Sequence, residues 1–358
     1  MTSPAEARRI GGEFELGARQ FGADAARPAS LPSYGNAHEL WLDTGRSALA
    51  VIAAHLRAVG GEAVVWLPAY SCESVAAPFA RQGLKMRFYA VGSRLQHVAA
   101  EPARGDALLF IHYFGTRNEA ALAQLDAWRA RGVRVIEDCV QAALTDGVGR
   151  HGDHAVTSLR KLLAQPDGAL LSSRLPLEAD VQAPDEAFVS ARIVGKLLRG
   201  SGAAADRFLP LFDESEAGLA DDRPRAMSRF SRHLLEHSDL AAAAARRVSN
   251  FKALAARLAE LPGTVGIEPL FDALADGEVP LGLPIVVADG RRDALRRHLM
   301  GHGIFCPVHW DLSHVAGDFA EERQLSTAIL TLPIDQRYDE HDMSAIHDSL
   351  STFIGARA

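Results

Sequence analysis

Between residues 41 and 139, short apolar runs alternate with stretches of helical periodicity, and this alternation constrains the fold more than any other feature. Residues 63–67 and 133–139 have the length and composition of buried strands. Residues 47–59 and 118–131 place their apolar side chains at helical spacing. Because strands separated by helices of about a dozen residues are typical of βαβ units, we expect a mostly parallel sheet covered by helices on both faces.

The C-terminal part of the chain has a different pattern. A strand is expected at residues 283–287, followed by a helix at 291–300, a strand-like stretch at 303–310 and a final helix at 340–353. The acidic segment at residues 212–225, FDESEAGLADDRPR, is expected to be a loop. These patterns predict a large domain at residues 1–240, whose first 38 residues form an N-terminal arm. They also predict a small C-terminal α+β domain at residues 241–358.

Composition excludes several classes of function. The chain carries 38 Lys and Arg residues against 45 Asp and Glu residues, so nucleic acid and anionic membranes are not expected as partners. Three cysteines are too few for a disulfide scaffold, and no Cys/His cluster has zinc-ligand spacing, so no metal site is expected. The first 20 residues contain no continuous apolar segment, and no run of about 18 apolar residues occurs. We therefore expect a soluble, cytoplasmic protein.

The first segment with a chemical signal is residues 42–49, LDTGRSAL. A strand ends there, Gly45 makes a turn, and a helix begins with Ser47 in its first turn. The first N–H groups of a helix have no internal partner, so such a turn can hold a phosphate. The alternative is an ordinary glycine turn with a serine N-cap. Neither a GxGxxG nor a Walker A sequence is present, which argues against a dinucleotide or P-loop site.

The second segment is residues 135–141, VIEDCVQ, in which Glu137 and Asp138 end an apolar strand. The carboxyl ends of parallel strands are where α/β proteins place their sites. One of the two carboxylates could hold a cationic ring nitrogen or a metal ion. In the alternative interpretation, both acids face solvent in the loop.

The third segment is residues 152–161, GDHAVTSLRK, and it decides between these interpretations. The chain has only four lysines, and Lys161 differs from the others because Ser158 precedes it by three residues at the end of an apolar run. A Ser-x-x-Lys arrangement lets the serine hold a phosphate while the amine, shielded from water, forms an imine with an aldehyde. A phosphate turn, a strand-end aspartate and this lysine, in that order, are typical of a fold-type I pyridoxal phosphate (PLP) enzyme.

These segments give the chain a resemblance to the DegT/DnrJ/EryC1/StrS family of PLP-dependent sugar aminotransferases. The likeness is collinear over residues 40–350, and it is most specific in VIEDCVQA (135–142) and GDHAVTSLRKLLAQPDGALLS (152–172). It implies the fold-type I architecture, a mostly parallel seven-stranded sheet sandwiched by helices with a smaller C-terminal α+β domain. It also implies transfer of an amino group from an amino acid, glutamate by family analogy, to a nucleotide-linked keto-sugar. Pyridoxamine 5'-phosphate (PMP) would form in the half-reaction, and a homodimer would share its active sites.

The resemblance also implies roles for individual residues. Lys161 would form the Schiff base with PLP and shuttle a proton, and Asp138 would pair with the protonated pyridine nitrogen and keep the ring cationic. Gln141 would lie against the phenolic-oxygen side of the ring. The family often has an aromatic residue at the position of Cys72, so either Tyr70 covers the ring face or the face is covered differently. The residues implied at the phosphate are Gly45, Arg46, Ser47 and Ser158.

The chain departs from the family pattern near the site, and the glycine-rich segment usually found after the lysine is reduced to PDG at residues 166–168. The family commonly spaces its serine five residues before the lysine, whereas the gap here is three. The family's Asn-Tyr-Arg-Met-Ser element, whose asparagine reaches the neighbouring subunit's phosphate, appears here as PRAMS at residues 224–228. Arg223 or Arg225 could replace the missing asparagine, because guanidinium suits phosphate; a surface salt bridge is the alternative.

His309 and Trp310 match the family's substrate-facing C-terminal segment, so substrate contact is expected there, with a core role for His309 as the alternative. His112 is expected to be a packed, hydrogen-bonded residue rather than an acid or base. Two other functions stay open: a PLP enzyme of another reaction type acting on an amino acid, and a non-catalytic relative that binds a ligand.

Overall fold

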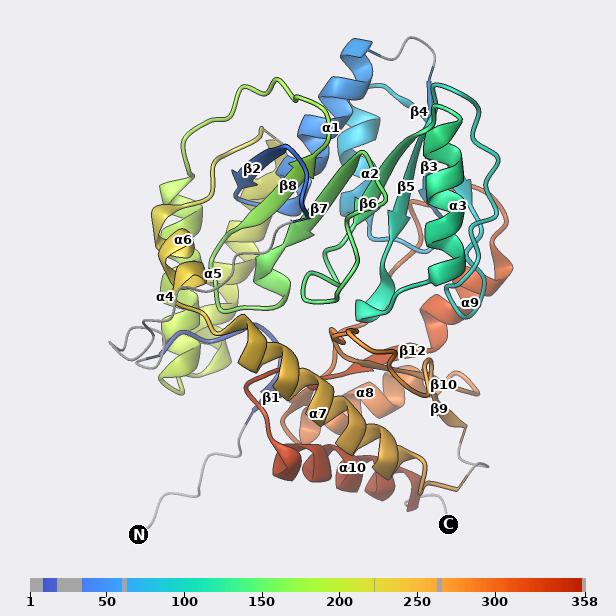
Figure 1. Cartoon of the computed structure of the whole chain (residues 1–358). Helices are drawn as coiled ribbons and strands as arrows, with labels where there is room; N and C mark the ends of the chain where they lie inside the picture. Colours follow the sequence, from blue (N-terminus) through green and yellow to red (C-terminus); the bar gives the residue numbers. More distant parts are fainter. Residues whose placement is uncertain (1–8, 18–33, 60–62, 222, 263–265, 356–358) are drawn as a thin grey trace.

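The larger unit of the protein is built around a seven-stranded sheet with the strand order β2-β8-β7-β6-β5-β3-β4 (Figure 1). The computed structural model describes residues 9–17, 34–59, 63–221, 223–262 and 266–355. Only β8 runs antiparallel to its neighbours, so the expected mostly parallel sheet is confirmed. The strands are β2 (His38–Leu42), β3 (Val64–Pro68), β4 (Lys85–Tyr89), β5 (Ala107–Ile111), β6 (Arg134–Asp138), β7 (His154–Ser158) and β8 (Ala169–Ser173).

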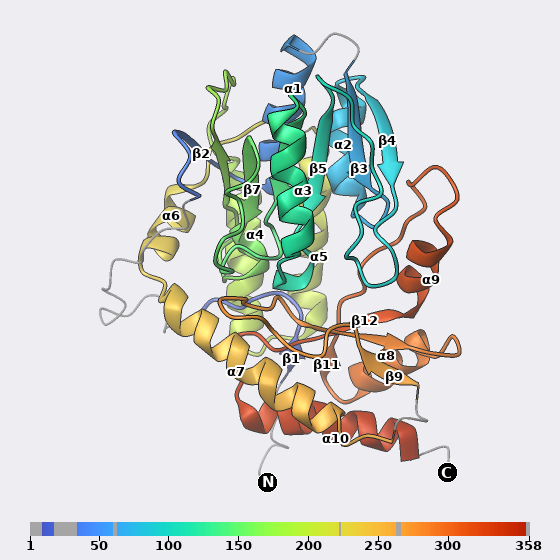
Figure 2. The same ribbon diagram turned by 45° about the vertical axis from the view of Figure 1, so that its right-hand side comes forward.

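Helices cover both faces of this sheet. The helices α1 (Gly45–Val59) and α2 (Glu73–Arg81) lie on one face, and α3 (Glu119–Ala130) lies on the other (Figures 1 and 2). The strand order moves in one direction from β3 to β4 and in the other from β5 to β6. Because crossovers between parallel strands are right-handed, α2 and α3 must then lie on opposite faces.

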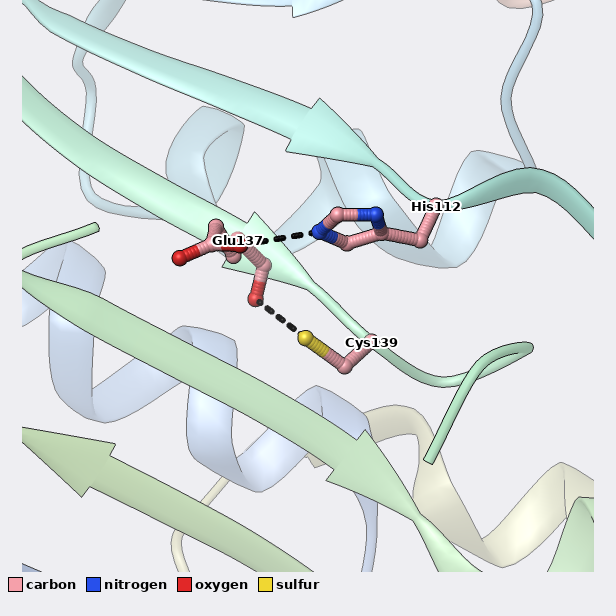
Figure 3. Close-up of side chains that lie close together, drawn as sticks. All are labelled: His112, Glu137 and Cys139. Carbon is pink, nitrogen blue, oxygen red and sulfur yellow. Dashed lines mark hydrogen bonds and ion pairs between the residues drawn. The ribbon is translucent and has the colours of Figure 1, made fainter. Parts of the chain in front are cut away.

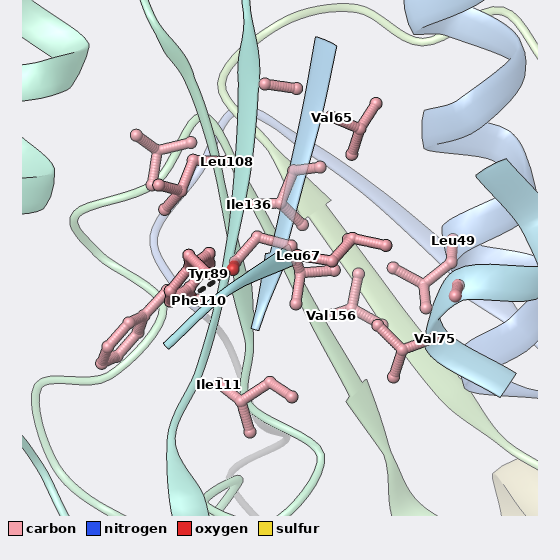
Figure 4. Close-up of a cluster of buried hydrophobic side chains, with 14 of the residues drawn as sticks. Leu49, Val65, Leu67, Val75, Tyr89, Leu108, Phe110, Ile111, Ile136 and Val156 are labelled. Atoms are coloured by element: carbon pink, nitrogen blue, oxygen red, sulfur yellow. Dashed lines mark hydrogen bonds between the residues drawn. The ribbon is translucent and has the colours of Figure 1, made fainter. Parts of the chain in front are cut away.

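The core of the larger unit lies between the sheet and these helices (Figure 4). Leu67, Ile136 and Val156 come from β3, β6 and β7, and Leu49 of α1 and Val75 of α2 pack toward them. All five residues of β5 and of β7 are buried. A strand covered on both faces favours apolar residues along its length, which explains the continuous apolar run of β5 in the sequence.

The smaller unit is a three-stranded antiparallel sheet flanked by helices, and it lies at the carboxyl edge of the large sheet (Figure 1). Its own apolar cluster includes Phe251, Ile285, Leu295 and Ile346. The boundary between residues 240 and 241 stays a prediction. The elements of this part are α7 (Leu240–Leu258), β9 (Ile267–Pro269), β10 (Leu283–Val287), α8 (Arg292–Gly301), β11 (Ile304–Phe305), α9 (Ala320–Ala328), β12 (Ile329–Leu332) and α10 (Glu340–Gly355). The strand expected at residues 303–310 is regular only over β11.

Residues 9–17 of the expected N-terminal arm connect the two units. The strand β1 (Ile10–Gly11) pairs in parallel with β11 of the smaller unit. Gly11 has φ of +88°, and a Cβ there would lie 2.1 Å from the Phe305 carbonyl oxygen, so the close pairing requires glycine. On the other side, the Lys196 Nζ of the larger unit donates to the Phe14 carbonyl. Residues 1–8 and 18–33 of the arm lie outside the described residues.

The expectation of a loop at residues 212–225 is wrong for its first half. Helix α5 (Ala205–Ala217) continues through it, packed against α4 (Glu186–Gly200), and α6 (Arg229–Glu236) follows. Phe208, Phe212 and Ser215 are buried at spacings of three and four residues, which is helical periodicity. The acidic residues between them hid this pattern. No described helix is both long enough and apolar enough to span a membrane.

Candidate active site

Three strand ends meet at the carboxyl edge of the large sheet. The start of α1, just after β2, carries Gly45, the end of β6 carries Asp138, and the end of β7 carries Ser158. Because these strands point in the same direction, the three residues line one cavity of about 140 Å³. A larger cavity of about 420 Å³ adjoins it, and the two share the lining residues Arg160, Lys161, Leu281 and His309.

Asp138 is a buried carboxylate that lines the smaller cavity. One of its oxygens accepts a hydrogen bond of 2.9 Å from the Val140 N–H, and among the described residues it has no ion-pair partner. Burial raises the pKa of Asp138 to about 6, against the lowering effects of that hydrogen bond and of the charges of His112 and Lys161. A cation in the cavity would therefore stabilise this carboxylate.

Glu137 lies on the opposite face of β6, because successive side chains of a strand alternate. Its carboxylate is buried and accepts hydrogen bonds from the His112 Nε2 and from the N–H groups of Gly149, His151 and Gly152, at 2.6–2.9 Å (Figure 3). A Cβ on Gly152 would lie 2.7 Å from the His154 carbonyl oxygen, so this close approach requires glycine. Both acids are buried, which rules out the alternative interpretation that they face solvent.

His112, Glu137 and Cys139 form a buried group whose potential metal-ligand atoms lie within 4.8 Å of one another (Figure 3). The two Glu137 oxygens already accept four hydrogen bonds, which uses the lone pairs that a carboxylate offers. The group therefore fixes the loop at residues 149–152. His112 is packed and hydrogen-bonded, as expected from the sequence.

Lys161 ends the short 3₁₀ helix η4 (Leu159–Lys161), which directly follows β7. Its side chain lines both cavities. Lys161 is exposed, so the expected shielding of its amine from water is wrong, because the amine opens onto cavities that reach the surface. Its charge nevertheless reaches the buried end of the site, where it lowers the pKa values of Asp138 and His309.

Most of the residues expected at the cofactor line the smaller cavity. Gln141 does so while its Oε1 accepts a hydrogen bond of 2.6 Å from the Phe114 N–H. Ser47 does not, because it packs inward in the first turn of α1, where its N–H donates to the Thr44 Oγ1 at 3.2 Å. Thr44 lines the cavity instead, a residue that sequence reasoning missed.

The expectation that Tyr70 covers the ring face differs from what the structure shows. Tyr70 is fully buried, donates its hydroxyl to the His309 carbonyl and lies outside the cavity lining, so it does not cover a ring there. Cys72 and Trp310 border the cavity. The Tyr70 ring packs behind Trp310, with 5.5 Å between their centroids, and supports it.

His309 is held by a hydrogen bond of 2.9 Å between its Nδ1 and the Thr331 Oγ1. Burial, and then the charge of Lys161, lower the pKa of His309 to about 3, so its imidazole is neutral at physiological pH. The Arg225 carbonyl accepts from the Asp43 N–H beside the start of α1. The side chains of Arg223 and Arg225 line neither cavity.

Sequence reasoning also missed a charged cluster in the smaller cavity. The Glu216 carboxylate, from α5, lies 2.6 Å from the Arg46 Nη2 and 2.8 Å from the Arg160 Nη2. Arg46, expected at the phosphate, is therefore paired with an acid. The position of Arg160 beside Lys161 was a usable signal, whereas Glu216 lay in a predicted loop and gave none.

Comparison with solved structures identifies the fold. The chain superposes on an aminotransferase, TlmJ from Streptoalloteichus hindustanus, with a TM-score of 0.67 and 21% identity, over 96% of this chain and 93% of that one. A DegT DnrJ EryC1 StrS aminotransferase from Brucella abortus gives a TM-score of 0.61 and 19% identity, over 98% and 93%. NtdA from Bacillus subtilis, solved with bound PMP, gives 0.63 and 14%, over 90% and 74%.

These likenesses show that the chain has the α/β fold of the fold-type I aminotransferases, as the sequence predicted. No protein-family sequence model matches the chain. No curated protein matches it by sequence either. The fold is thus established through tertiary structure, and the activity has to be argued from the site.

Proposed function

We propose that this protein is a PLP-dependent aminotransferase, a divergent relative of the DegT/DnrJ/EryC1/StrS enzymes. It moves an amino group from an amino acid, with glutamate as the expected donor, to a keto-sugar that carries a nucleotide. One observation carries the proposal: Asp138, buried and without an ion-pair partner in the described part of the chain, shares one cavity with Lys161 at the carboxyl edge of a fold-type I sheet. Solved structures with this fold include the sugar aminotransferase CalS13 from Micromonospora echinospora.

The residues of the smaller cavity fit PLP. Asp138 offers the counter-charge that a protonated pyridine nitrogen needs, and it has no other ion-pair partner among the described residues. Gly45 at the start of α1, together with Ser158, would hold the phosphate. Gln141 would approach the ring from the side, and Lys161 is the amine that would hold the aldehyde carbon. When bound, PLP supplies a cationic ring that accepts the electron pair released as a substrate C–H bond breaks.

The chain's own residues would then perform three tasks. The Asp138 carboxylate would keep a pyridine nitrogen protonated, since a nearby negative charge favours the cationic form. The Lys161 Nζ would take up and return the proton of the substrate carbon. The neutral His309 borders both cavities and adds no positive charge beside that amine. The larger cavity would receive the donor and then the acceptor, one after the other.

The half-reaction with glutamate tests this proposal. Purified protein loaded with PLP should lose its visible absorbance band when glutamate is added, and PMP and 2-oxoglutarate should appear in equal amounts. Nucleotide-linked keto-sugars should then restore the band and be aminated. A band that persists with glutamate would favour a PLP enzyme of another reaction type, and a chain that binds no PLP would favour a non-catalytic, ligand-binding protein.

The proposal includes a cytoplasmic homodimer whose active sites are shared between subunits, as the resemblance implies. Light scattering on the purified protein tests the oligomeric state. Mixing an inactive Lys161→Ala subunit with subunits altered at Arg223 or Arg225 tests sharing, because restored activity in the mixture requires a site built from both chains.

A further inference from the structure

A cluster of charged side chains lies beside the smaller cavity, and Arg46, Arg160 and Glu216 of this cluster line the cavity itself. Ion pairs among the described residues connect four cations, Arg46, Arg160, Arg192 and Lys196, with only two carboxylates, Glu13 and Glu216. Two positive charges therefore remain in the cluster. A phosphate monoester carries about −1.5 to −2 at pH 7, which matches this excess.

Burial makes the excess significant. The side chains of Arg192 and Lys196 are 2% and 0% exposed, and that of Arg160 is 11% exposed. Buried charge is unfavourable unless it is paired and hydrogen-bonded. The Arg160 Nε is buried and has no hydrogen-bond partner in the described part of the chain, although Arg160 lines both cavities. The Asp167 carboxylate also feels the charge of Arg160, but it is held by Ser228 and Ser231.

We propose that Arg160, which Glu216 holds beside Arg46, is a phosphate ligand of the cofactor site, and that Glu216 is an internal counter-ion with which the phosphate competes. This inference rests on the proposed function. It places the second cationic ligand of the phosphate within the same chain, at the residue before Lys161. It gives α5 a role in cofactor affinity, because Glu216 and the two arginines line one cavity with Gly45 and Ser158.

Comparing two aldehydes distinguishes binding of the phosphate group from reaction of the aldehyde with Lys161. PLP and pyridoxal, which lacks the phosphate, are titrated into the full chain, and their affinities are read from visible absorbance without any turnover. Arg160→Gln should weaken PLP binding by about ten- to a hundredfold, the effect of losing a hydrogen bond to a charged group, and leave pyridoxal binding unchanged. Arg160→Lys should give an intermediate loss. Arg207→Gln, at an exposed position of α5, is the matched control. Equal losses for both aldehydes, or no loss, would overturn the assignment of Arg160.

Glu216→Gln should act in the opposite direction. Removing its charge leaves three positive charges in excess, so PLP should bind roughly two- to fivefold more tightly while pyridoxal is unaffected. Glu214→Gln, exposed on the same helix, is the control. Weaker PLP binding in Glu216→Gln would show that Glu216 only positions the arginines, and the competition would be disproved.

A wild-type experiment keeps the proposal testable even where Arg160→Gln does not fold. Inorganic phosphate should compete with PLP but not with pyridoxal, and it should raise the melting temperature of the chain. Competition against both aldehydes would contradict a separate phosphate site. If neither aldehyde gives a visible band, the proposed aminotransferase function fails, while a phosphate-dependent melting temperature that is weakened in Arg160→Lys would still support the anion site.

Discussion

The two faces of strand β6 place neighbouring carboxylates in opposite situations. Burial alone would raise the pKa of Glu137, but its hydrogen bond to His112, the charge of His112 and the N–H groups of Gly152 and Gly149 lower it. Asp138 is equally buried but accepts one backbone hydrogen bond, and its pKa rises to about 6. A saturated carboxylate stabilises the structure, whereas an undersatisfied carboxylate in a cavity is available to a ligand.

On the face of the sheet edge that lines the cavity, we expect the largest effect on function from Lys161. Lys161→Ala should abolish both the visible band with PLP and amino transfer, because no other lysine lines the smaller cavity. Its free energy of unfolding should stay within about 0.5 kcal/mol of wild type, since an exposed side chain is removed. Absorbance titration and urea denaturation measure the two effects. Retained amino transfer would remove Lys161 from the mechanism.

Asp138→Asn should separate function from stability on the same face. We expect a loss of amino transfer of about 10²–10³-fold, because the ring nitrogen loses the charge that stabilises its protonated form. The unliganded variant should be no less stable than wild type, since a buried, unpaired charge is removed. Steady-state kinetics and urea denaturation test this contrast, and wild-type turnover would show that Asp138 is not the ring partner.

Glu137→Gln should have the opposite profile. Its amide can accept fewer of the four hydrogen bonds and leaves His112 badly paired, so the free energy of unfolding should fall by about 2–4 kcal/mol. Amino transfer per folded molecule should change far less than in Asp138→Asn. Denaturation curves combined with activity per PLP bound measure this. A stable but inactive variant would place Glu137 in the active site.

The pH dependence of stability should also differ between the two faces. Folded Asp138 keeps its proton up to about pH 6, while the unfolded chain loses it near 3.8, so stability falls as pH rises through this window, by roughly 3 kcal/mol. Glu137 has a lowered pKa, so its contribution is present above its ordinary value of 4.5 and is lost as pH falls through the lower, folded-state pKa. Asp138→Asn should remove the first slope and Glu137→Gln the second, in urea denaturation of the unliganded protein at a series of pH values.

The smallest effect concerns two serines at the phosphate end. Ser158→Ala should weaken PLP binding by about tenfold, as expected for one hydrogen bond to a charged group. Ser47→Ala should leave the affinity unchanged, because Ser47 lies outside the cavity lining. Equal losses in the two variants would mean that the first turn of α1 opens further toward the ligand than this structure shows.

Local sequence patterns predicted much of this fold. Strand and helix periodicity predicted the parallel sheet and both C-terminal helices, and the strand-end positions of Asp138 and Ser158 predicted that they share a site. The helix α5 was missed because acidic residues interrupt its apolar spacing. The burial of Tyr70 could not be foreseen, since it depends on Trp310 and His309, more than two hundred residues away.

The sequence by itself determined the sheet, the order of its strands' functional ends and the lysine that follows β7, because these depend on periodicity and on neighbours in the chain. It also required Glu137 and Asp138 to point to opposite faces. Only the tertiary structure decided which of the two faces the cavity, that Lys161 is open to solvent, and that Glu216 meets Arg46 and Arg160. Those outcomes depend on how segments that are distant in the sequence approach one another, because the burial of a side chain and its charged partners are set by these contacts.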